Sequence, residues 1–213
     1  MPLLFGGAVL LFLAAPGIDL AASALFYKPG NGFPLGHTDW AQLFYKGSPL
    51  LVRLWIVILA AAALASLWQR FRRLRRHALF LLAVLAVGPG LALTVLKDHW
   101  GRARPHQIVE FGGDRQFTPA WVISDQCETN CAFASGHASG AFSLLALAWV
   151  FPRRRRFWLV AGVAWGAHMG LVRMAQGGHF LSDVVFAGFI VYFSADLLAR
   201  WVFYRPRPVT VAS

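Results

Sequence analysis

The chain has 213 residues, of which 58% are hydrophobic and 14% are charged, with a formal net charge of +11. Typical soluble domains carry roughly 25% charged residues, so these values and a mean hydropathy of +0.56 exclude an ordinary soluble domain. The arginines stand in short clusters between apolar runs, which points to a membrane and excludes nucleic acid as a partner.

The apolar runs predict an all-α, polytopic membrane protein with six transmembrane helices in a single domain spanning residues 1–213. The first run lacks the positively charged start of a secretory signal peptide, so we expect it to be a retained span. Asp19, toward its far end, is expected to be an interfacial carboxylate or a local cap. Pro89 is expected to kink the third span. The six runs are residues 1–26, 50–68, 78–96, 134–151, 157–172 and 184–202.

Two loops and three arginine clusters set the predicted orientation. Residues 27–49 are rich in turn formers and predict an external loop, with Trp40, Phe44 and Tyr45 in an interfacial aromatic belt or a short helix on the membrane. Residues 97–133 form the long polar loop. Because Lys and Arg accumulate in cytoplasmic loops, the clusters place both termini in the cytoplasm and the histidine-bearing loops outside. The clusters are residues 70–76, 153–156 and 200–207.

Residues 173–183 place three charge-bearing side chains at a membrane boundary. His179 and Asp183 are four residues apart, so on a helix they share a face and the carboxylate can hold the imidazole in one tautomer. Such a histidine is a candidate nucleophile. The Gly-Gly pair before it would let the backbone turn and bring in Arg173, whose planar guanidinium suits phosphate. The alternative is that the next helix simply begins here, while Arg173 reaches the lipid headgroups.

Two further basic residues and a serine-glycine-histidine sequence stand at the same predicted face. Lys97 and Arg104 are seven residues apart, so both can point from one face of a helix that continues out of the third span as far as the next proline. Ser135 is a plausible N-cap of the fourth span, and Gly136 permits close backbone approach to a phosphate at the helix N-terminus. His137 would stand beside that phosphate. Headgroup contacts and ordinary helix capping are the alternatives for each group taken alone.

The three groups occur in a fixed order and spacing. They are Lys97, six residues and Arg104-Pro105, then Ser135-Gly136-His137, then Arg173, five residues, His179, three residues and Asp183. This pattern resembles the three-part signature of the type 2 phosphatidic acid phosphatase (PAP2) superfamily. Ala134 stands where that family commonly has proline, and Val172 stands where it commonly has serine. Val172 lacks a hydroxyl that could donate to phosphate.

The resemblance implies a phosphatase that forms a phosphohistidine. His179 would attack phosphorus, Asp183 would orient its ring, and His137 would protonate the leaving oxygen and later activate water. These fixed charges take the place of a metal ion, so no metal and no cofactor is expected. Arg102 is a possible substrate contact, with a headgroup or Asp98 as alternative partners. The phosphate-binding groups would be Lys97, Arg104, Arg173, Ser135 and Gly136.

A site at the outer ends of membrane helices meets lipid headgroups that arrive sideways, so the expected substrate is a lipid phosphate in the bilayer. Residues 100–105, 110–113 and 117–121, together with the loop that contains Cys127 and Cys131, look most similar to bacterial lipid A phosphatase-like members. Undecaprenyl pyrophosphate, phosphatidylglycerophosphate and phosphatidic acid are alternative substrates, and phosphate transfer to another acceptor is an alternative reaction. A non-catalytic lipid-binding or transport protein would need the cations but neither histidine. A vanadate-dependent peroxidase would share the anion site, but those enzymes are soluble.

The predicted location is the bacterial inner membrane with the active site facing the periplasm, and no obligate protein partner is implied. Cys127 and Cys131 are too few for a disulfide framework or a zinc site. They lie in the predicted outer loop, in an oxidising compartment, so we expect a disulfide between them. It would close the loop just ahead of Ser135 and steady the phosphate-binding helix start.

Overall fold

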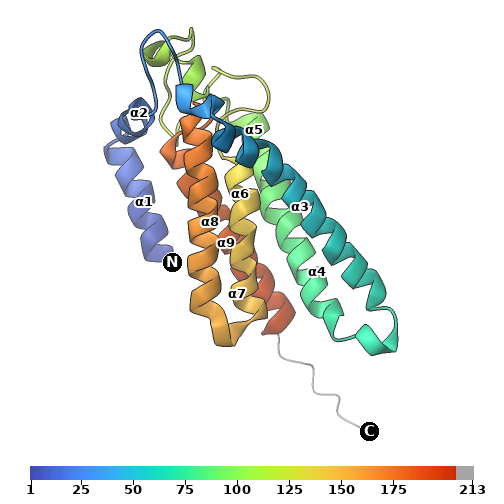
Figure 1. Cartoon of the computed structure of the whole chain (residues 1–213). Helices are drawn as coiled ribbons and strands as arrows, with labels where there is room; N and C mark the ends of the chain where they lie inside the picture. Colours follow the sequence, from blue (N-terminus) through green and yellow to red (C-terminus); the bar gives the residue numbers. More distant parts are fainter. Residues whose placement is uncertain (205–213) are drawn as a thin grey trace.

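Helices that lie side by side make up most of the protein (Figure 1). The computed structural model describes residues 1–204. Within this range the chain forms helices and two isolated β-bridges, which confirms the predicted all-α class. The α-helices are α1 (Pro2–Ala14), α2 (Gly17–Ala24), α3 (Asp39–Ala65), α4 (Leu74–Leu85), α5 (Leu93–His99), α6 (Gly136–Phe142), α7 (Leu147–Val150), α8 (Arg155–Ala175) and α9 (Leu181–Phe203).

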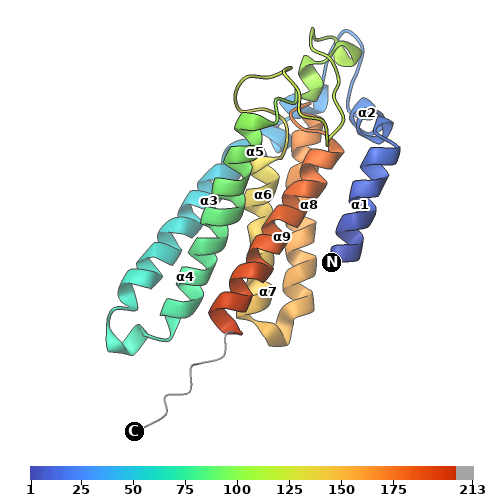
Figure 2. The same ribbon diagram turned by 180° about the vertical axis from the view of Figure 1, so that it is seen from behind.

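Three stretches are long and apolar enough to cross a membrane. Within the described residues these are Asp39–Ala65, Leu74–His99 and Leu181–Phe203, and α1 with α2 adds a fourth if that pair, bent by 87°, counts as one span. The stretch from α6 to α7, Gly136–Val150, is apolar but shorter. α1, α3, α4–α5, α6–α7, α8 and α9 run alongside one another in Figures 1 and 2. The count of six spans stays a prediction that this arrangement permits.

α3 begins earlier than the sequence predicted. The expected external loop of residues 27–49 ends at Thr38, whose Oγ1 accepts a backbone hydrogen bond of 3.4 Å, and Pro49 lies inside the helix. Threonine is a favourable N-cap residue. The added turns pack against α8, where the rings of Phe44 and His168 have centroids 4.5 Å apart. Tertiary packing therefore extends α3 beyond its apolar part.

Pro89 lies in a π-helical segment, Ala86–Ala92, that joins α4 to α5. The stretch Leu74–His99 runs through it as one helix. A π-helical turn is wider than an α-helical turn, so it can accommodate the proline ring and the missing amide hydrogen. The distortion expected at Pro89 therefore takes the form of this local widening.

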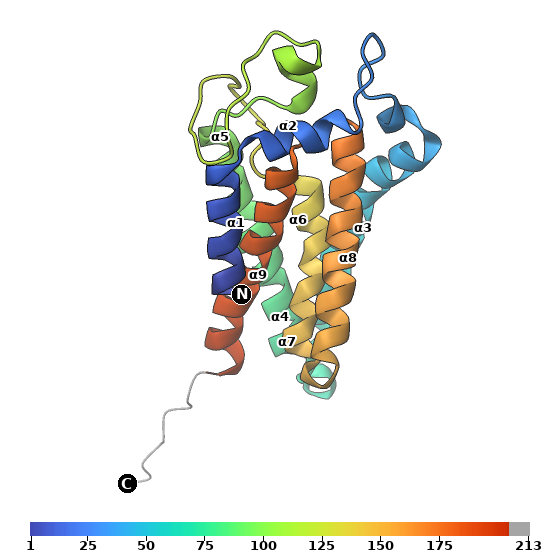
Figure 3. The ribbon, with the colours of Figure 1, turned by 90° about the vertical axis from the view of Figure 1, so that its left-hand side faces the viewer.

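The first apolar run does not form one straight span. α1 ends at Ala14, and α2 begins after Pro16 at an angle of 87°, so that α2 crosses one end of the bundle (Figure 3). This crossing buries Asp19 against the start of α9, with only 1% of the residue exposed. The prediction that Asp19 is an interfacial carboxylate or a local cap is therefore wrong, because the bend carries it inward to side-chain partners.

A row of glycines on α8 sets how closely the central helices pack. Gly162, Gly166 and Gly170 are four residues apart and share one face. A Cβ at Gly166 would stand 2.1 Å from the Phe142 ring of α6, and a Cβ at Gly170 would stand 2.2 Å from Val184 of α9. Small residues at this spacing let membrane helices approach closely. α8 is thus the helix on which both α6 and α9 pack.

The two ends of the bundle differ in composition. The arginine-rich residues 70–76 and 153–156 lie at one end, where the chain passes from one long helix to the next, and the long loop 100–135 covers the other end (Figures 1 and 3). Arg205 and Arg207 of the third arginine cluster lie outside the described residues. Arginine clusters at one end of the bundle are the arrangement that the positive-inside rule describes for membrane proteins.

We expect Gly166→Ala to destabilise the protein by about 1–3 kcal/mol, because the added methyl group would overlap the Phe142 ring. Gly7→Ala is the matched control. Gly7 lies in α1, and a Cβ added there would meet no atom within 4 Å, so alanine at this position should be neutral or slightly stabilising. Thermal unfolding of the purified variants in detergent measures both effects. Equal unfolding midpoints would show that the α6–α8 contact tolerates a side chain.

Candidate active site

A cavity of about 430 Å³ opens at the loop-covered end of the bundle. Its walls come from α3, α5, α6 and α8, from the loop before α6 and from the segment before α9. Ser135 and Asp183 meet beside this wall, where Ser135 N donates to Asp183 O at 3.1 Å. The predicted site residues that line the cavity are Lys97, Arg104, Gly136, His137, Arg173 and His179.

His179 is held by the backbone on one side of its ring and lines the cavity. Its Nδ1 lies 2.8 Å from Ala132 O, and because a carbonyl only accepts, Nδ1 carries the proton and Nε2 keeps a lone pair. Burial lowers the pKa of His179 to about 3, although Asp183 opposes that shift. The ring is therefore neutral at neutral pH, which is the form that can act as a nucleophile.

The backbone around His179 differs from the prediction. α9 begins at Leu181, so His179 precedes the helix and does not share a helical face with Asp183. The carboxylate is nevertheless close, with Oδ2 3.6 Å from His179 Nδ1. The same oxygen accepts the amide hydrogen of Phe180 at 2.8 Å, as an acidic side chain in the first turn of a helix does. Asp183 thus fixes both the helix start and the charge beside the imidazole.

The Gly177-Gly178 turn positions Arg173. Gly177 adopts φ +61°, in the left-handed region that favours glycine. A Cβ at Gly178 would stand 2.3 Å from Arg173 Nη2, so the guanidinium needs a residue without a side chain there. The turn brings Arg173 and His179 into one cavity, as the sequence predicted.

Tyr45 links two of the site residues, which the sequence did not indicate. Its ring stacks on the His137 ring with centroids 4.9 Å apart, and Arg173 Cζ lies 4.7 Å from its centroid. Stacking and cation–π contact both restrict side chains. The sequence predicts an aromatic belt or a short helix on the membrane for Tyr45, because no local signal shows that the start of α3 reaches this site.

Lys97 and Arg104 are held by the loop that precedes α6. Lys97 Nζ donates to Asn130 Oδ1 and to Cys131 O, both at 3.1 Å, and Arg104 Nη2 donates to Asn130 O at 2.7 Å. The prediction that both cations share a helical face is wrong, because α5 ends at His99 and Arg104 lies in extended backbone. They converge because they bind acceptors of the same loop.

Two buried polar atoms of the predicted site residues have no hydrogen-bond partner within residues 1–204. They are Ser135 Oγ and Arg173 Nε; Ser135 occupies the N-cap position of α6, but its side chain does not cap the helix. An unpaired buried polar group costs about 1–3 kcal/mol, so these donors suit a ligand that accepts from them. Beside Lys97, Arg104 and the amides at the start of α6, such a ligand is an oxyanion.

A disulfide joins Cys127 and Cys131 in the loop that holds the two cations, with Cα atoms 5.7 Å apart. Asn130, which contacts both Lys97 and Arg104, lies within this small ring. A cross-link restricts the conformations open to the enclosed residues. The bridge therefore steadies the acceptors that position both cations.

Comparison with known proteins gives the family of this chain. The family model described as PAP2 superfamily matches residues 77–207, which is more than half of the sequence. The chain belongs to the PAP2 superfamily. No solved structure matches it.

This PAP2 protein is similar to several bacterial lipid A phosphatases over most of its length. The lipid A 4'-phosphatase of Francisella tularensis subsp. novicida is 38% identical over 209 residues, which cover 92% of this chain and 89% of that protein. The lipid A 4'-phosphatase of Rhizobium etli is 34% identical and that of Rhizobium leguminosarum is 33% identical, each over 82% of this chain and over 75% and 83% of the respective relative. With the apolar helices described above, these matches make the chain a bacterial membrane protein.

The PAP2 signature of this chain has unusual residues at Ala134 and Val172. Both are completely buried, and neither is among the residues that line the described cavity. The side chains of these two residues therefore lie behind the cavity wall.

Arg102 lies beneath the PAP2 site and not within it. Its side chain is 0% exposed, and its guanidinium donates to Asp183 Oδ1 at 2.6 Å, to Asp19 Oδ2 at 2.7 Å and, through Nε, to Thr118 O at 2.8 Å. The expectation that Arg102 contacts the substrate, a headgroup or Asp98 is therefore corrected. A buried cation requires carboxylate partners, and the fold supplies them from the interior.

Asp19 completes a series of contacts that ends at His179. Its Oδ1 accepts from Ser182 N at 2.8 Å, and its Oδ2 accepts from Ser182 Oγ at 2.5 Å as well as from Arg102. Arg102 in turn holds Asp183 beside His179. No local sequence signal could have found Asp19, because 163 positions separate it from Ser182.

We expect Asp19→Asn to destabilise the protein by on the order of 3 kcal/mol, because it leaves a buried guanidinium with less compensating charge. Catalytic turnover should fall as well, since Arg102, which holds Asp183 in place, then loses the only other carboxylate that it binds within the described residues. Asp114→Asn, which breaks the exposed ion pair with Arg115, is the control and should change neither property. Thermal unfolding in detergent and turnover of a phosphate monoester measure the two effects. Wild-type stability and turnover in Asp19→Asn would remove Asp19 from the support of the site.

Proposed function

We propose that this protein is a lipid phosphatase that hydrolyses a phosphate monoester of lipid A. The observation that carries the proposal is the convergence of a neutral His179 with three cations in one cavity at the end of an apolar bundle. The unpartnered Ser135 Oγ lies beside this cavity, and the unpartnered Arg173 Nε belongs to one of the three cations. The 4'-phosphate is the first candidate, since the relatives named lipid A 4'-phosphatase align with 82% to 92% of this chain. A relative named lipid A 1-phosphatase aligns with 52% of it.

In the proposed first step, Nε2 of His179 attacks phosphorus in line with the ester oxygen of the lipid. The P–N bond forms while the P–O bond to the lipid breaks. His137, whose protonated form is stabilised by the negative charge of the bound phosphate, gives its proton to the leaving oxygen. The dephosphorylated lipid departs as an alcohol and a phosphohistidine remains. The Ala132 carbonyl and Asp183 stabilise the positive ring through its Nδ1–H.

In the proposed second step, water hydrolyses the phosphohistidine. His137, now neutral, accepts a proton from the water molecule whose oxygen attacks phosphorus. The P–N bond breaks, inorganic phosphate leaves, and His179 returns to its neutral form. Phosphate transfer to an alcohol would differ only in the acceptor of this step.

The binding groups act by charge that is in place before the substrate arrives. Such preorganised donors stabilise the charge that develops on the phosphoryl oxygens without reorganising during the reaction. We infer that they make a metal ion unnecessary, and within the described residues no group of three or more His, Cys, Asp or Glu could hold one. The proposed phosphate-binding groups are Lys97, Arg104, Arg173, Ser135 Oγ and the Gly136 amide.

We propose that the protein lies in the inner membrane, with both termini in the cytoplasm and the cavity facing the periplasm. The arginine-rich residues 70–76 and 153–156 lie at the end of the bundle opposite the long loop 100–135 (Figure 1), and Arg104 and Asn130 of that loop line the cavity. This is the separation that the proposed orientation needs. A cysteine at Gly112 in a background without Cys127 and Cys131 should react with a membrane-impermeant reagent added to spheroplasts. One at Arg73 should react only after permeabilisation, and the reverse pattern would contradict the orientation.

The purified protein should release phosphate from lipid A in buffer that contains EDTA, and mass spectrometry of the product should locate the loss at the 4' position. The comparison lipids are undecaprenyl pyrophosphate, phosphatidylglycerophosphate and phosphatidic acid at equal concentration in the same detergent. Loss at the 1 position would move the assignment to the other phosphate. A higher kcat/KM for one of the comparison lipids would replace lipid A, and activity that requires added magnesium would contradict the metal-independent mechanism.

We expect His179→Ala to reduce turnover by several orders of magnitude while lipid binding survives, because the cations and not the imidazole form the binding site. His137→Ala should accumulate phosphoenzyme with p-nitrophenyl phosphate, whose leaving group needs no proton. His99→Ala, outside the cavity, is the control and should behave as wild type. Rapid-quench labelling with radioactive phosphate measures the intermediate. Appreciable turnover by His179→Ala would exclude it as the nucleophile.

A further inference from the structure

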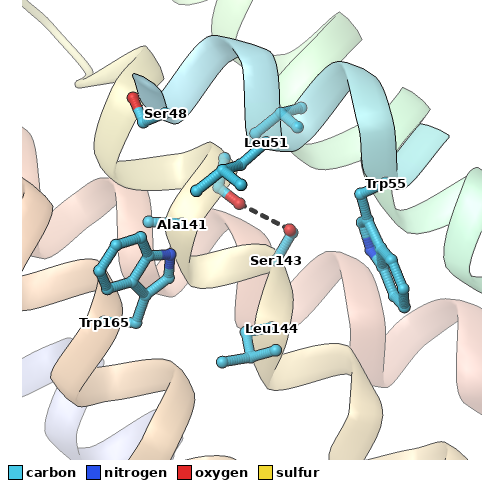
Figure 4. A pocket seen from close by; sticks show the side chains of 9 residues that line it. Ser48, Leu51, Trp55, Ala141, Ser143, Leu144 and Trp165 are labelled. Carbon is cyan, nitrogen blue, oxygen red and sulfur yellow. Dashed lines mark hydrogen bonds between the residues drawn. The ribbon is translucent and has the colours of Figure 1, made fainter. Parts of the chain in front are cut away.

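A second cavity, which is a groove between α3, α6 and α8, has a volume of about 130 Å³ (Figure 4). Trp55 and Leu51 of α3 and Trp165 of α8 project toward it, and Leu144 lies at its far end in this view. Ser143 contributes no free donor, since its hydroxyl donates to Gly140 O at 2.6 Å. Apart from Ser48 and the indole N–H groups of Trp55 and Trp165, the side chains that line this groove are apolar or internally satisfied.

The groove adjoins the phosphate cavity. Ser48, Val52 and Gly140 line both, so the groove and the phosphate cavity share a border. Pockets that enclose a whole small ligand usually measure about 300–1,000 Å³. A groove of about 130 Å³ therefore suits a segment of a larger molecule whose head occupies the phosphate cavity.

Ser48 supplies a second, independent indication of a ligand at the junction. The residue is 6% exposed, and its Oγ is buried without a hydrogen-bond partner in the part of the chain that the structure describes. Serine hydroxyls inside membrane helices usually donate to a backbone carbonyl of the preceding turn, and this one does not. A donor left free at the border of a phosphate site and an apolar groove suits an oxygen of the ligand near the start of its chain.

We propose that this groove holds the acyl chain next to the phosphate of the lipid substrate, and that Ser48 donates to the first oxygen of that chain. That oxygen is an ester or amide carbonyl or a chain hydroxyl. The inference rests on the proposed lipid phosphatase function and adds a requirement for an acylated substrate. A polyprenyl phosphate, whose chain carries no oxygen beyond the phosphate ester, would leave Ser48 without its partner.

The groove contributes orientation more than affinity. Lipid tails are as apolar as the groove, so moving a chain from the bilayer into it gains little from the hydrophobic effect. A chain held between α3 and α8 does fix the direction from which the phosphate meets His179. Misplacement of a reacting group by about 1 Å can cost on the order of a hundredfold in rate, so the effect should appear in kcat/KM for long-chain substrates.

Leu51→Trp tests the groove because the larger side chain would fill it. Leu54→Trp is the matched control, since both leucines lie on α3 and are 53% exposed, but only Leu51 lines the groove. We expect Leu51→Trp to lower kcat/KM for lipid A about tenfold or more. For p-nitrophenyl phosphate, which has no chain, kcat/KM of this variant should stay within about twofold of the wild-type value. Leu54→Trp should match wild type with both substrates. Equal values for the two tryptophan variants with lipid A would overturn the proposal.

Ser48→Ala gives a second test that adds no volume. It should reduce kcat/KM more for lipid A than for undecaprenyl phosphate, so that the ratio between the two lipids falls. An unchanged ratio would exclude the bond to the chain oxygen. Unfolding midpoints of all variants separate a folding defect from a lost contact. Failure of wild-type protein to release phosphate from lipid A would instead contradict the proposed function, which keeps the two failures distinct.

Discussion

A buried guanidinium holds the catalytic end of this protein together. Arg102 binds Asp19 of α2 and Asp183 of α9 at 2.7 Å and 2.6 Å, with all three side chains at most 1% exposed. Removing charges from water costs several kcal/mol for each ion, so this arrangement persists only while all three remain in contact. α2 must therefore cross the bundle end, and the first turn of α9 must stay where Asp183 meets His179.

The cations of the cavity are held in a different way. Lys97 and Arg104 donate to neutral oxygens of the Asn130 loop, and Arg173 donates to Gln176 Oε1. No ion pair of these three appears within residues 1–204. Neutral acceptors fix a cation's position but leave its charge uncompensated, so the attraction remains available for a phosphate. Carboxylates bind Arg102 below the site and neutralise its charge. Side-chain amides and backbone carbonyls bind the cations of the cavity and leave their charge available.

The membrane setting explains why one end of a helical bundle can serve both parts of a lipid. The phosphate cavity lies where helix ends meet a polar loop, and the adjoining groove lies between the sides of α3, α6 and α8. Gly140 lines both and lets α3 approach α6, since a Cβ there would stand 3.0 Å from Val52. Close helix approach at one small residue thus gives the proposed chain site and the phosphate site a common border.

The sequence alone determined the fold class, the family and the residues that gather at the cavity, because apolar runs and the spacing of the PAP2 signature are local properties of the chain. It also indicated that the turn before His179 would bring Arg173 to the site. Only the tertiary structure decided the roles of Asp19, Arg102 and Tyr45. A carboxylate on α2 is indistinguishable in sequence from an interfacial one, and its burial follows from an 87° bend and a partner 163 residues away. Contacts over that separation depend on how helices pack, and no pattern of neighbours along the chain records them.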